Sequence, residues 1–131
     1  MFIINLTQHA ASAEQAAAGV VDLPNALRSA LSEALTFEEL PSSEEVKARA
    51  EAIAELACNN GLGADDSDDP FPQGAMIGGA LWLMRPLADE LEARGIKPLF
   101  AFSKRDSVET NGPDGALVKT AVFRHLGFVP A

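Results

Sequence analysis

The chain has few cysteines and few basic residues, and each shortage excludes a class of protein. A single cysteine in 131 residues can form no internal disulfide and has no partner at the spacing of a zinc site. Ten Lys and Arg stand against nineteen Asp and Glu, which gives a net charge of −9. Nonspecific binding to nucleic acid or to an anionic membrane needs a basic face that neutralises phosphates. We therefore expect neither duplex nucleic acid nor a membrane as a partner.

Long apolar runs are also missing. No uninterrupted run approaches the roughly 18 to 20 residues that are needed to cross a bilayer. Residues 1–6 lack the basic start and the long apolar stretch of a signal peptide. With 47% hydrophobic residues, a chain of 131 residues is long enough to bury one core and too short for two. We predict a single cytoplasmic domain over residues 1–131.

Residues that usually carry nucleophilic or metal chemistry are scarce. No set of residues indicates a hydrolytic triad, and Cys58 falls in a helical pattern beside alanines, which favours a buried structural role over a reactive thiol. The only plausible metal ligands are Asp65, Asp66, Asp68 and Asp69, which lack the glycine and the terminal glutamate of a calcium loop. We interpret these acids as a solvated loop and expect neither a bound metal nor an organic cofactor.

Strand and helix patterns alternate along the chain. Capping boxes begin at Ser12 and at Ser42, and Pro86 makes the last helix start late or kink. The alternation predicts an α/β fold with a mostly parallel central sheet, flanking helices and a C-terminal β-hairpin. The predicted strands are residues 2–6, 20–24, 75–77 and 99–102, the helices begin near residues 12, 25, 42 and 81, and the hairpin pairs residues 99–110 with residues 116–129.

Three short polar stretches each follow directly on a predicted strand. They are Thr7-Gln8-His9, Gly78-Gly79-Ala80 and Ser103-Lys104-Arg105. An open α/β sheet binds its ligand outside the carboxyl ends of its strands, so parallel neighbours would bring the three stretches into one pocket. Hydroxyls, backbone N–H groups, an imidazole and two cations suit a phosphate ester. Residues 85–131 carry a net charge of +1 and residues 1–84 carry −10, so we expect an anion site in the second half.

The glycines and histidines each have a structural alternative. Gly78 and Gly79 would let the backbone approach a ligand at a helix start, or would simply make a tight turn. His9 is suited to hydrogen-bond a phosphate or to transfer a proton, and it is equally suited to order its own loop. For His125, late in a predicted strand, we favour a structural or interface role.

Lys104 and Arg105 form the stronger candidate for an anion site. Arginine offers a bidentate fork, and the flanking Ser103 and Ser107 offer hydroxyls for phosphate oxygens. The alternative is that both cations are ordinary surface charges at the end of a strand.

The two ends of the chain carry a family resemblance. The residues concerned are Ile4-Asn5-Leu6-Thr7-Gln8-His9 and Ser12-Ala13-Glu14-Gln15 near the start, and Pro98-Leu99-Phe100-Ala101-Phe102-Ser103-Lys104-Arg105, Pro113-Asp114-Gly115, Lys119 and Val122-Phe123-Arg124-His125 near the end. Together they resemble the small stand-alone Csx-type CRISPR-associated proteins. The resemblance implies a single Rossmann-like domain of the CARF type, and a ring nuclease that opens a cyclic oligoadenylate, most simply cyclic tetra-adenylate, without a metal.

In such a nuclease the pocket would hold a ribose 2′-hydroxyl in line with phosphorus and stabilise the charge on the phosphoryl oxygens. The implied roles are phosphate stabilisation by Lys104 and Arg105, backbone donation by Gly78, Gly79 and Ala80, and ribose orientation or proton transfer by Thr7, Gln8 and His9.

A four-nucleotide ring has a two-fold axis, so the natural receptor is a homodimer with two apposed pockets. Its candidate interface residues are Val122, Phe123, Phe128 and Val129. Two alternatives remain open. One is a noncatalytic sensor or sponge that releases the nucleotide intact. The other is a protein-interaction module, for example a phage-encoded inhibitor, that uses the acidic first half as its surface.

Overall fold

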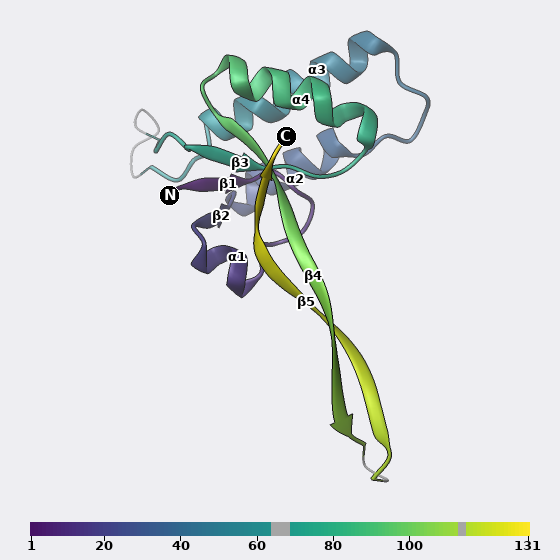
Figure 1. The fold of residues 1–131 in the computed structure, drawn as a ribbon. Coiled ribbons are helices and arrows are strands. Elements are labelled where there is room, and N and C mark those ends of the chain that lie inside the picture. Colours follow the sequence, from purple (N-terminus) through teal and green to yellow (C-terminus); the bar gives the residue numbers. More distant parts are fainter. Residues whose placement is uncertain (64–68, 113–114) are drawn as a thin grey trace.

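The computed structural model describes residues 1–63, 69–112 and 115–131, and a sheet with the strand order β2-β1-β3-β4-β5 forms its centre (Figure 1). β1 pairs in parallel with both β2 and β3, and β3 pairs in parallel with β4. β4 and β5 are antiparallel. The prediction of an α/β fold with a mostly parallel sheet is confirmed. The strands are β1 (Ile3–Asn5), β2 (Val20–Asp22), β3 (Gly74–Met76), β4 (Lys97–Asn111) and β5 (Leu117–Pro130).

Helices flank both faces of the sheet unequally. They are α1 (Ala13–Ala17), α2 (Asn25–Leu35), α3 (Ser43–Cys58) and α4 (Leu81–Ala93). The last three bury their apolar faces in one large cluster on one face of the sheet, whereas α1 lies on the other side and buries none of its residues (Figure 1). In the described part of the chain, no helix is both long enough and apolar enough to cross a membrane.

Successive side chains of a strand point to opposite faces, so β1 contributes to two clusters. Ile4 belongs to the large cluster beneath α2, α3 and α4. Ile3 belongs to a small cluster with Val20, Met76 and Leu99 on the face of α1. The core of the protein therefore lies almost entirely on one side of its sheet.

Capping residues begin two of the helices where the sequence predicted them. Ser12 accepts a hydrogen bond from the Gln15 N–H at 3.1 Å, and the Gln15 side chain accepts one from the Ser12 N–H at 3.0 Å, which completes the predicted capping box. Ser42 accepts a hydrogen bond from the Glu45 N–H at the start of α3. These bonds satisfy N–H groups that have no partner within the helix.

Pro86 lies inside α4, which begins at Leu81, so of the two predicted effects of this proline the late start does not occur and the kink stays a prediction. A proline in a helix interior has no N–H to donate and so removes one backbone hydrogen bond. Leu83 and Leu87, on either side of it, are fully buried in the large cluster. Their burial stabilises the helix more than the proline weakens it, at roughly 1.5–3 kcal/mol for each buried leucine.

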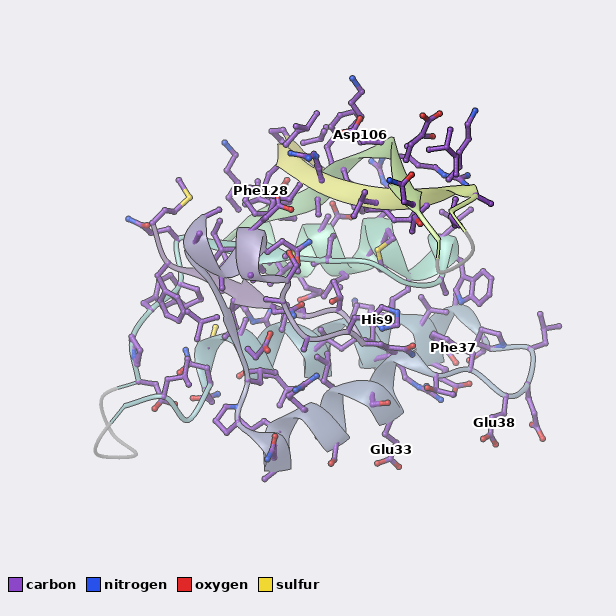
Figure 2. All side chains as sticks on the ribbon, turned by 90° about the horizontal axis from the view of Figure 1, so that it is seen from below. His9, Glu33, Phe37, Glu38, Asp106 and Phe128 are labelled. Atoms are coloured by element: carbon purple, nitrogen blue, oxygen red, sulfur yellow. The ribbon has the colours of Figure 1, made fainter. Side chains whose placement is uncertain are left out.

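β4 and β5 continue beyond the rest of the sheet. β3 pairs with β4 only as far as Leu99, but the ladder between β4 and β5 runs on to the pair Asn111 and Leu117, past a bulge after Phe102. We call residues 103–126 the arm and the rest of the chain the body. The arm projects from the body as a twisted two-stranded ribbon (Figure 1). Figure 2 shows Asp106 on the arm and Phe128 near its base.

Candidate functional site

A pocket of about 480 Å³ opens at the carboxyl ends of β1 and β3. β2 lies on one side of β1 and β3 on the other, so the order of strands changes direction between β1 and β3. In open α/β sheets the crevice at such a switch point is where ligands bind. The residues that line it are Thr7, Gln8, His9, Ala10, Gln15, Leu35, Met76, Gly78, Gly79, Ala80 and Ala101.

Asn5 organises the first wall of this pocket, which is the loop after β1. Its buried amide nitrogen donates to the carbonyl of His9 at 2.7 Å and to Oδ1 of Asp22 at 2.8 Å. Its Oδ1 accepts from the backbone N–H of Thr7 at 2.9 Å and from the Thr7 hydroxyl at 2.7 Å. All four hydrogen-bonding positions of the amide are thus used, which fixes the loop that carries Thr7, Gln8 and His9.

Asn5 was not among the site residues predicted from the sequence. The signal was an amide in the middle of the apolar run of residues 2–6, because a buried amide must find partners nearby. Gln15 was interpreted only as a helix cap, yet it also lines the pocket.

The second wall consists of residues 78–80 and the start of α4. Gly79 has a φ of +137°, a conformation that favours glycine. Gly78 approaches the first wall so closely that a Cβ there would lie 3.5 Å from Cγ2 of Thr7. Ala80 precedes α4 without a side-chain cap, and the N–H of Leu83 donates to the Ala80 carbonyl at 3.1 Å, which leaves the N–H groups of Leu81 and Trp82 uncapped by a side chain.

The pocket carries no fixed charge. Among the residues described by the structure, no Lys, Arg, Asp or Glu lines it, and its one imidazole belongs to His9. Gln8 and His9 are exposed, whereas Thr7 is half-buried. The pocket therefore offers a hydroxyl, two side-chain amides, an imidazole and backbone N–H groups to a ligand, and no acid in it repels an anion.

The third predicted stretch lies outside the pocket, on the arm. β4 does not end at Phe102 but pairs with β5 as far as Asn111, which carries the stretch away from the carboxyl edge of the sheet. Ala101 lines the pocket, and the predicted residues beyond it do not. Those residues are Ser103, Lys104, Arg105 and Ser107, which lie opposite His125, Arg124, Phe123 and Ala121 of β5. The structure thus brings two of the three stretches together. All the residues that line this pocket except Ala101 belong to residues 1–84, so it does not lie in the second half of the chain, where an anion site was expected.

Strand alternation also separates the two cations. Neighbouring residues of a strand point to opposite faces, and directly opposed residues of an antiparallel pair share a face. Lys104 therefore shares a face of the arm with Arg124, and Arg105 shares the other face with Phe123. A single anion on one face of the ribbon would contact one of these cations and not the other.

The predicted interface residues differ in what they contact. Val122, Phe123 and Val129 are exposed. Phe128 is half-buried, packs against the small cluster, and lies 4.8 Å from the ring of His125, so it is an internal contact and not a free interface residue. Both ring nitrogens of His125 are buried and have no hydrogen-bond partner among the described residues, and the structural or interface role expected for this histidine stays a prediction.

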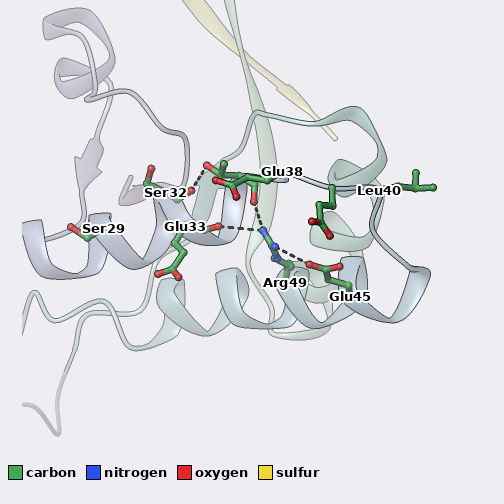
Figure 3. A pocket seen from close by; sticks show the side chains of 9 residues that line it. Ser29, Ser32, Glu33, Glu38, Leu40, Glu45 and Arg49 are labelled. Carbon is green, nitrogen blue, oxygen red and sulfur yellow. Dashed lines mark hydrogen bonds and ion pairs between the residues drawn. The ribbon is translucent and has the colours of Figure 1, made fainter.

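A larger pocket of about 730 Å³ lies between α2 and α3 (Figure 3), but its chemistry opposes an anion. Arg49 in this pocket donates to the backbone carbonyls of Glu33, at 3.2 Å, and of Thr36 at the end of α2. Its guanidinium also pairs with Glu45 at 2.8 Å and lies over the ring of Phe37. Arg49 is therefore occupied in capping α2, and the four glutamates that line the pocket leave it negative.

The other chemical candidates have structural roles. Three of the predicted loop acids, at positions 65, 66 and 68, lie outside the described residues, and Asp69 accepts the N–H groups of Gly61 at 2.8 Å and Gly63 at 3.1 Å. Within the described ranges no group of metal-ligating side chains gathers. Burial raises the pKa of the Cys58 thiol, and the nearby Glu55 raises it further, which keeps this thiol protonated.

The fold and the pocket together define an α/β protein with a ligand-sized crevice at the switch point of its sheet. Residues 1–129 match the model of the Uncharacterized protein MJ1673 family, and the chain belongs to that family. No curated protein and no solved structure matches the chain. The description of the family names no activity, so the function has to be argued from the chemistry of the pocket.

Proposed function

We propose that the protein binds a cyclic oligoadenylate, in the first place cyclic tetra-adenylate, and opens its ring without a metal. The observation that carries the proposal is the pocket at the switch point, where Thr7, Gln8 and His9 face the turn of residues 78–80. Residues 4–9 also belong to the resemblance to the stand-alone Csx-type proteins. The parallel pairing of β2, β1, β3 and β4 supports the Rossmann-like fold of CARF type that this resemblance implies.

The size and polarity of the pocket suit part of such a ring. A volume of about 480 Å³ falls within the range of small-ligand sites, which is about 300–1,000 Å³. A four-nucleotide ring is larger than one such pocket, so each chain of a homodimer would take half of it. The open N–H groups at the start of α4 would bind a phosphate, and the apolar side chains of Leu35 and Met76 would contact a base.

The reaction would be an internal transesterification. The ribose 2′-oxygen attacks the neighbouring phosphorus, the bond from phosphorus to the 5′-oxygen breaks, and the products carry a 2′,3′-cyclic phosphate and a 5′-hydroxyl. The 2′-hydroxyl loses a proton and the 5′-oxygen gains one, and an imidazole such as that of His9 can take part in both transfers. Thr7 and Gln8 would orient the ribose, and in-line positioning would supply much of the acceleration.

The experiment is incubation with cyclic tetra-adenylate in the presence of EDTA, followed by separation of the products. We expect linear products with 2′,3′-cyclic phosphate ends. His9→Ala should slow cleavage by about 10²- to 10⁴-fold, the usual contribution of a general acid or base. His125→Ala is the matched control, because the second histidine of the chain lies on the arm and lines no part of the pocket.

Two results would overturn parts of the proposal. Absence of binding in calorimetry would refute the nucleotide assignment as a whole. An intact nucleotide together with a raised melting temperature would remove the catalytic step and leave a noncatalytic sensor or sponge. One observation favours that second candidate: among the described lining residues, His9 is the only one suited to proton transfer near neutral pH.

A further inference from the structure

The pocket lacks a cation, and two of the four cations of the arm form no ion pair among the described residues. Anion sites commonly contain Arg or Lys, yet neither lines the pocket within the described chain. On the arm, Arg124 pairs with Asp106 at 3.0 Å and Lys119 lies 3.8 Å from Glu109. Arg105 is exposed and, as far as the described residues extend, makes no ion pair. Its guanidinium is therefore available to a group outside its own chain.

The arm also exposes large apolar side chains. Phe123 and Leu117 are each 68% exposed, and Leu126 is 60% exposed. A two-stranded ribbon on its own is marginally stable in water, and exposed apolar side chains on it indicate a surface that is covered in the assembled protein. Phe123 lies directly opposite Arg105, so an exposed aromatic ring and a free guanidinium share one face of the arm. Aromatic residues and arginine are the types that dominate the binding energy of protein interfaces.

Charge and length favour a second copy of this chain as the partner. The arm holds four Lys or Arg and three Asp or Glu, a net charge of +1, whereas the body carries −10. The nearly neutral arm of one copy therefore meets less like-charge repulsion from the acidic body of another than a second body would, and the two arm cations outside ion pairs are attracted to it. Residues 103–111 extend for about 30 Å at roughly 3.3 Å per residue, which is about the diameter of a small domain. The arm is therefore long enough to lie across the body of a second copy.

The position of Arg105 along the arm suggests what it meets there. The arm leaves the body at the rim of the pocket, because Ala101 lines the pocket and residues 103–111 follow it directly. If two pockets face each other across a two-fold axis, an arm that runs on past its own pocket passes the pocket of the partner. Arg105 lies four residues beyond Ala101, or about 13 Å farther along the strand.

We infer that Arg105 of one copy enters the pocket of a second copy in a two-fold homodimer and binds a phosphate of the ligand there. The inference rests on the proposed function for the identity of the ligand, but not for the contact between chains. Each site then consists of residues 7–9 and 78–80 from one chain and the guanidinium from the other. Lys104 points to the opposite face of the arm and has no part in the site, which makes it the matched control.

The first test is a mixed dimer assembled from two differently tagged variants. One chain carries Arg105→Ala and the other carries Gln8→Ala with His9→Ala. We expect each variant alone to bind cyclic tetra-adenylate at least tenfold more weakly than the unmodified protein, and the mixed dimer to regain about half of the cleavage rate, since one of its two sites is intact. Lys104→Ala should change affinity less than twofold. Where the unmodified protein cleaves the ring, a mixed dimer no more active than its parents would overturn the inference. Where it binds the ring without cleaving it, an Arg105→Ala variant with unchanged affinity would overturn it.

The second test needs no nucleotide. In a Cys58→Ala background, Gln8→Cys is placed in one chain and Arg105→Cys in another of different length, and the mixture is oxidised mildly. A disulfide-linked product with the summed mass of the two chains is expected, whereas Gln8→Cys with Glu51→Cys, an exposed position on α3, should give none. A monomer in light scattering, or no cross-linking above that control, would refute the contact.

The two tests keep the proposals apart. A cross-link without nucleotide binding would remove the proposed function and leave the arm contact standing. Cleavage that is insensitive to Arg105→Ala, without a cross-link, would remove the arm contact and leave the proposed function standing.

Discussion

The body and the arm differ in where they place their large apolar residues. In the body, Ile53 of α3 and Leu83, Leu87 and Leu91 of α4 are fully buried in the large cluster. In the arm, Phe123 is 68% exposed and pairs only with the opposite strand of its own ribbon. The body therefore has its own source of stability, because buried apolar area drives folding. The arm buries no apolar area of comparable size, so we expect its structure and its function to depend on what it contacts.

The pocket lies at the junction of these two regions. Its walls are loops held by the body, and its rim includes Ala101, where β4 leaves the body for the arm. Rigid elements thus position Thr7, His9 and Gly79, while the cation predicted for the site is carried by the exposed ribbon.

Leu87→Ala should have the largest effect. It removes a fully buried side chain from the large cluster, and such truncations cost about 2–5 kcal/mol of unfolding free energy. The matched change on the arm, Phe123→Ala, should cost less than about 1 kcal/mol at protein concentrations too low for association. Urea denaturation followed by circular dichroism measures both. Equal losses would show that the arm belongs to the same cooperative core as the body.

Asn5→Asp should destabilise the first wall of the pocket in a pH-dependent way. The substitution removes the donor to Asp22 and places a second carboxylate 2.8 Å from the first. Burial and the like charge raise the folded pKa of the new carboxyl, so its neutral form is favoured. In the unfolded chain an aspartic acid has a pKa of about 4. The variant should therefore be closest in stability to the unmodified protein below about pH 4, and it should lose stability as the pH rises from there through the raised pKa of the folded state. Thermal unfolding at several pH values measures this, and a flat profile would contradict it.

Gly79→Ala should cost about 1–2 kcal/mol, because a φ of +137° strains any residue with a Cβ. Gly78→Ala is the control, since it shares the turn but not the positive φ, and its new Cβ would lie at an ordinary contact distance of 3.5 Å from Thr7. Chemical denaturation compares the two variants. Equal stability would mean that the turn is not held as the structure describes it.

The smallest effect concerns the reactivity of thiols. Burial and Glu55 raise the pKa of Cys58, so this thiol should react slowly near pH 7 and faster as the pH rises toward its raised pKa. A cysteine introduced on the exposed arm by Ser107→Cys, in a Cys58→Ala background, should react faster at the same pH. Labelling with a maleimide followed by mass spectrometry measures both rates. Similar rates would indicate that the body around Cys58 opens readily.

Much of the fold followed from local patterns. Ser12 and Ser42 marked helix starts correctly because a cap acts on N–H groups only three residues away. The start predicted near residue 25 is also confirmed, since α2 begins at Asn25. The late start considered for α4 at Pro86 does not occur, because burial of the neighbouring leucines in the large cluster offsets the local cost of the proline.

The site was harder to predict from the sequence than the fold. Residues 7–9 and 78–80 were expected to meet, and they line the same pocket because β1 pairs with β3. Asn5 was not predicted as a site residue because its four hydrogen-bonding partners come close to it only when β1, β2 and the loop after β1 come together. Ser103, Lys104 and Arg105 were predicted to follow the end of a strand at Phe102, although they also lie within the predicted hairpin of residues 99–110 and 116–129. The hairpin is confirmed, because the ladder with β5 continues through these residues, and the strand end at Phe102 is wrong.

The order of residues alone established the helix starts and the alternation of strands and helices, because caps and apolar spacing act between residues that are close in the chain. It also established the net negative charge, which is the sum of the charges of the individual residues. Which polar stretches share a pocket was decided by pairing between strands far apart in the chain, such as Ile4 with Ala75. The projection of Arg105 into solvent was decided by its pairing with Phe123. Such pairings depend on how the whole sheet packs, and a short stretch of sequence carries no information about that packing.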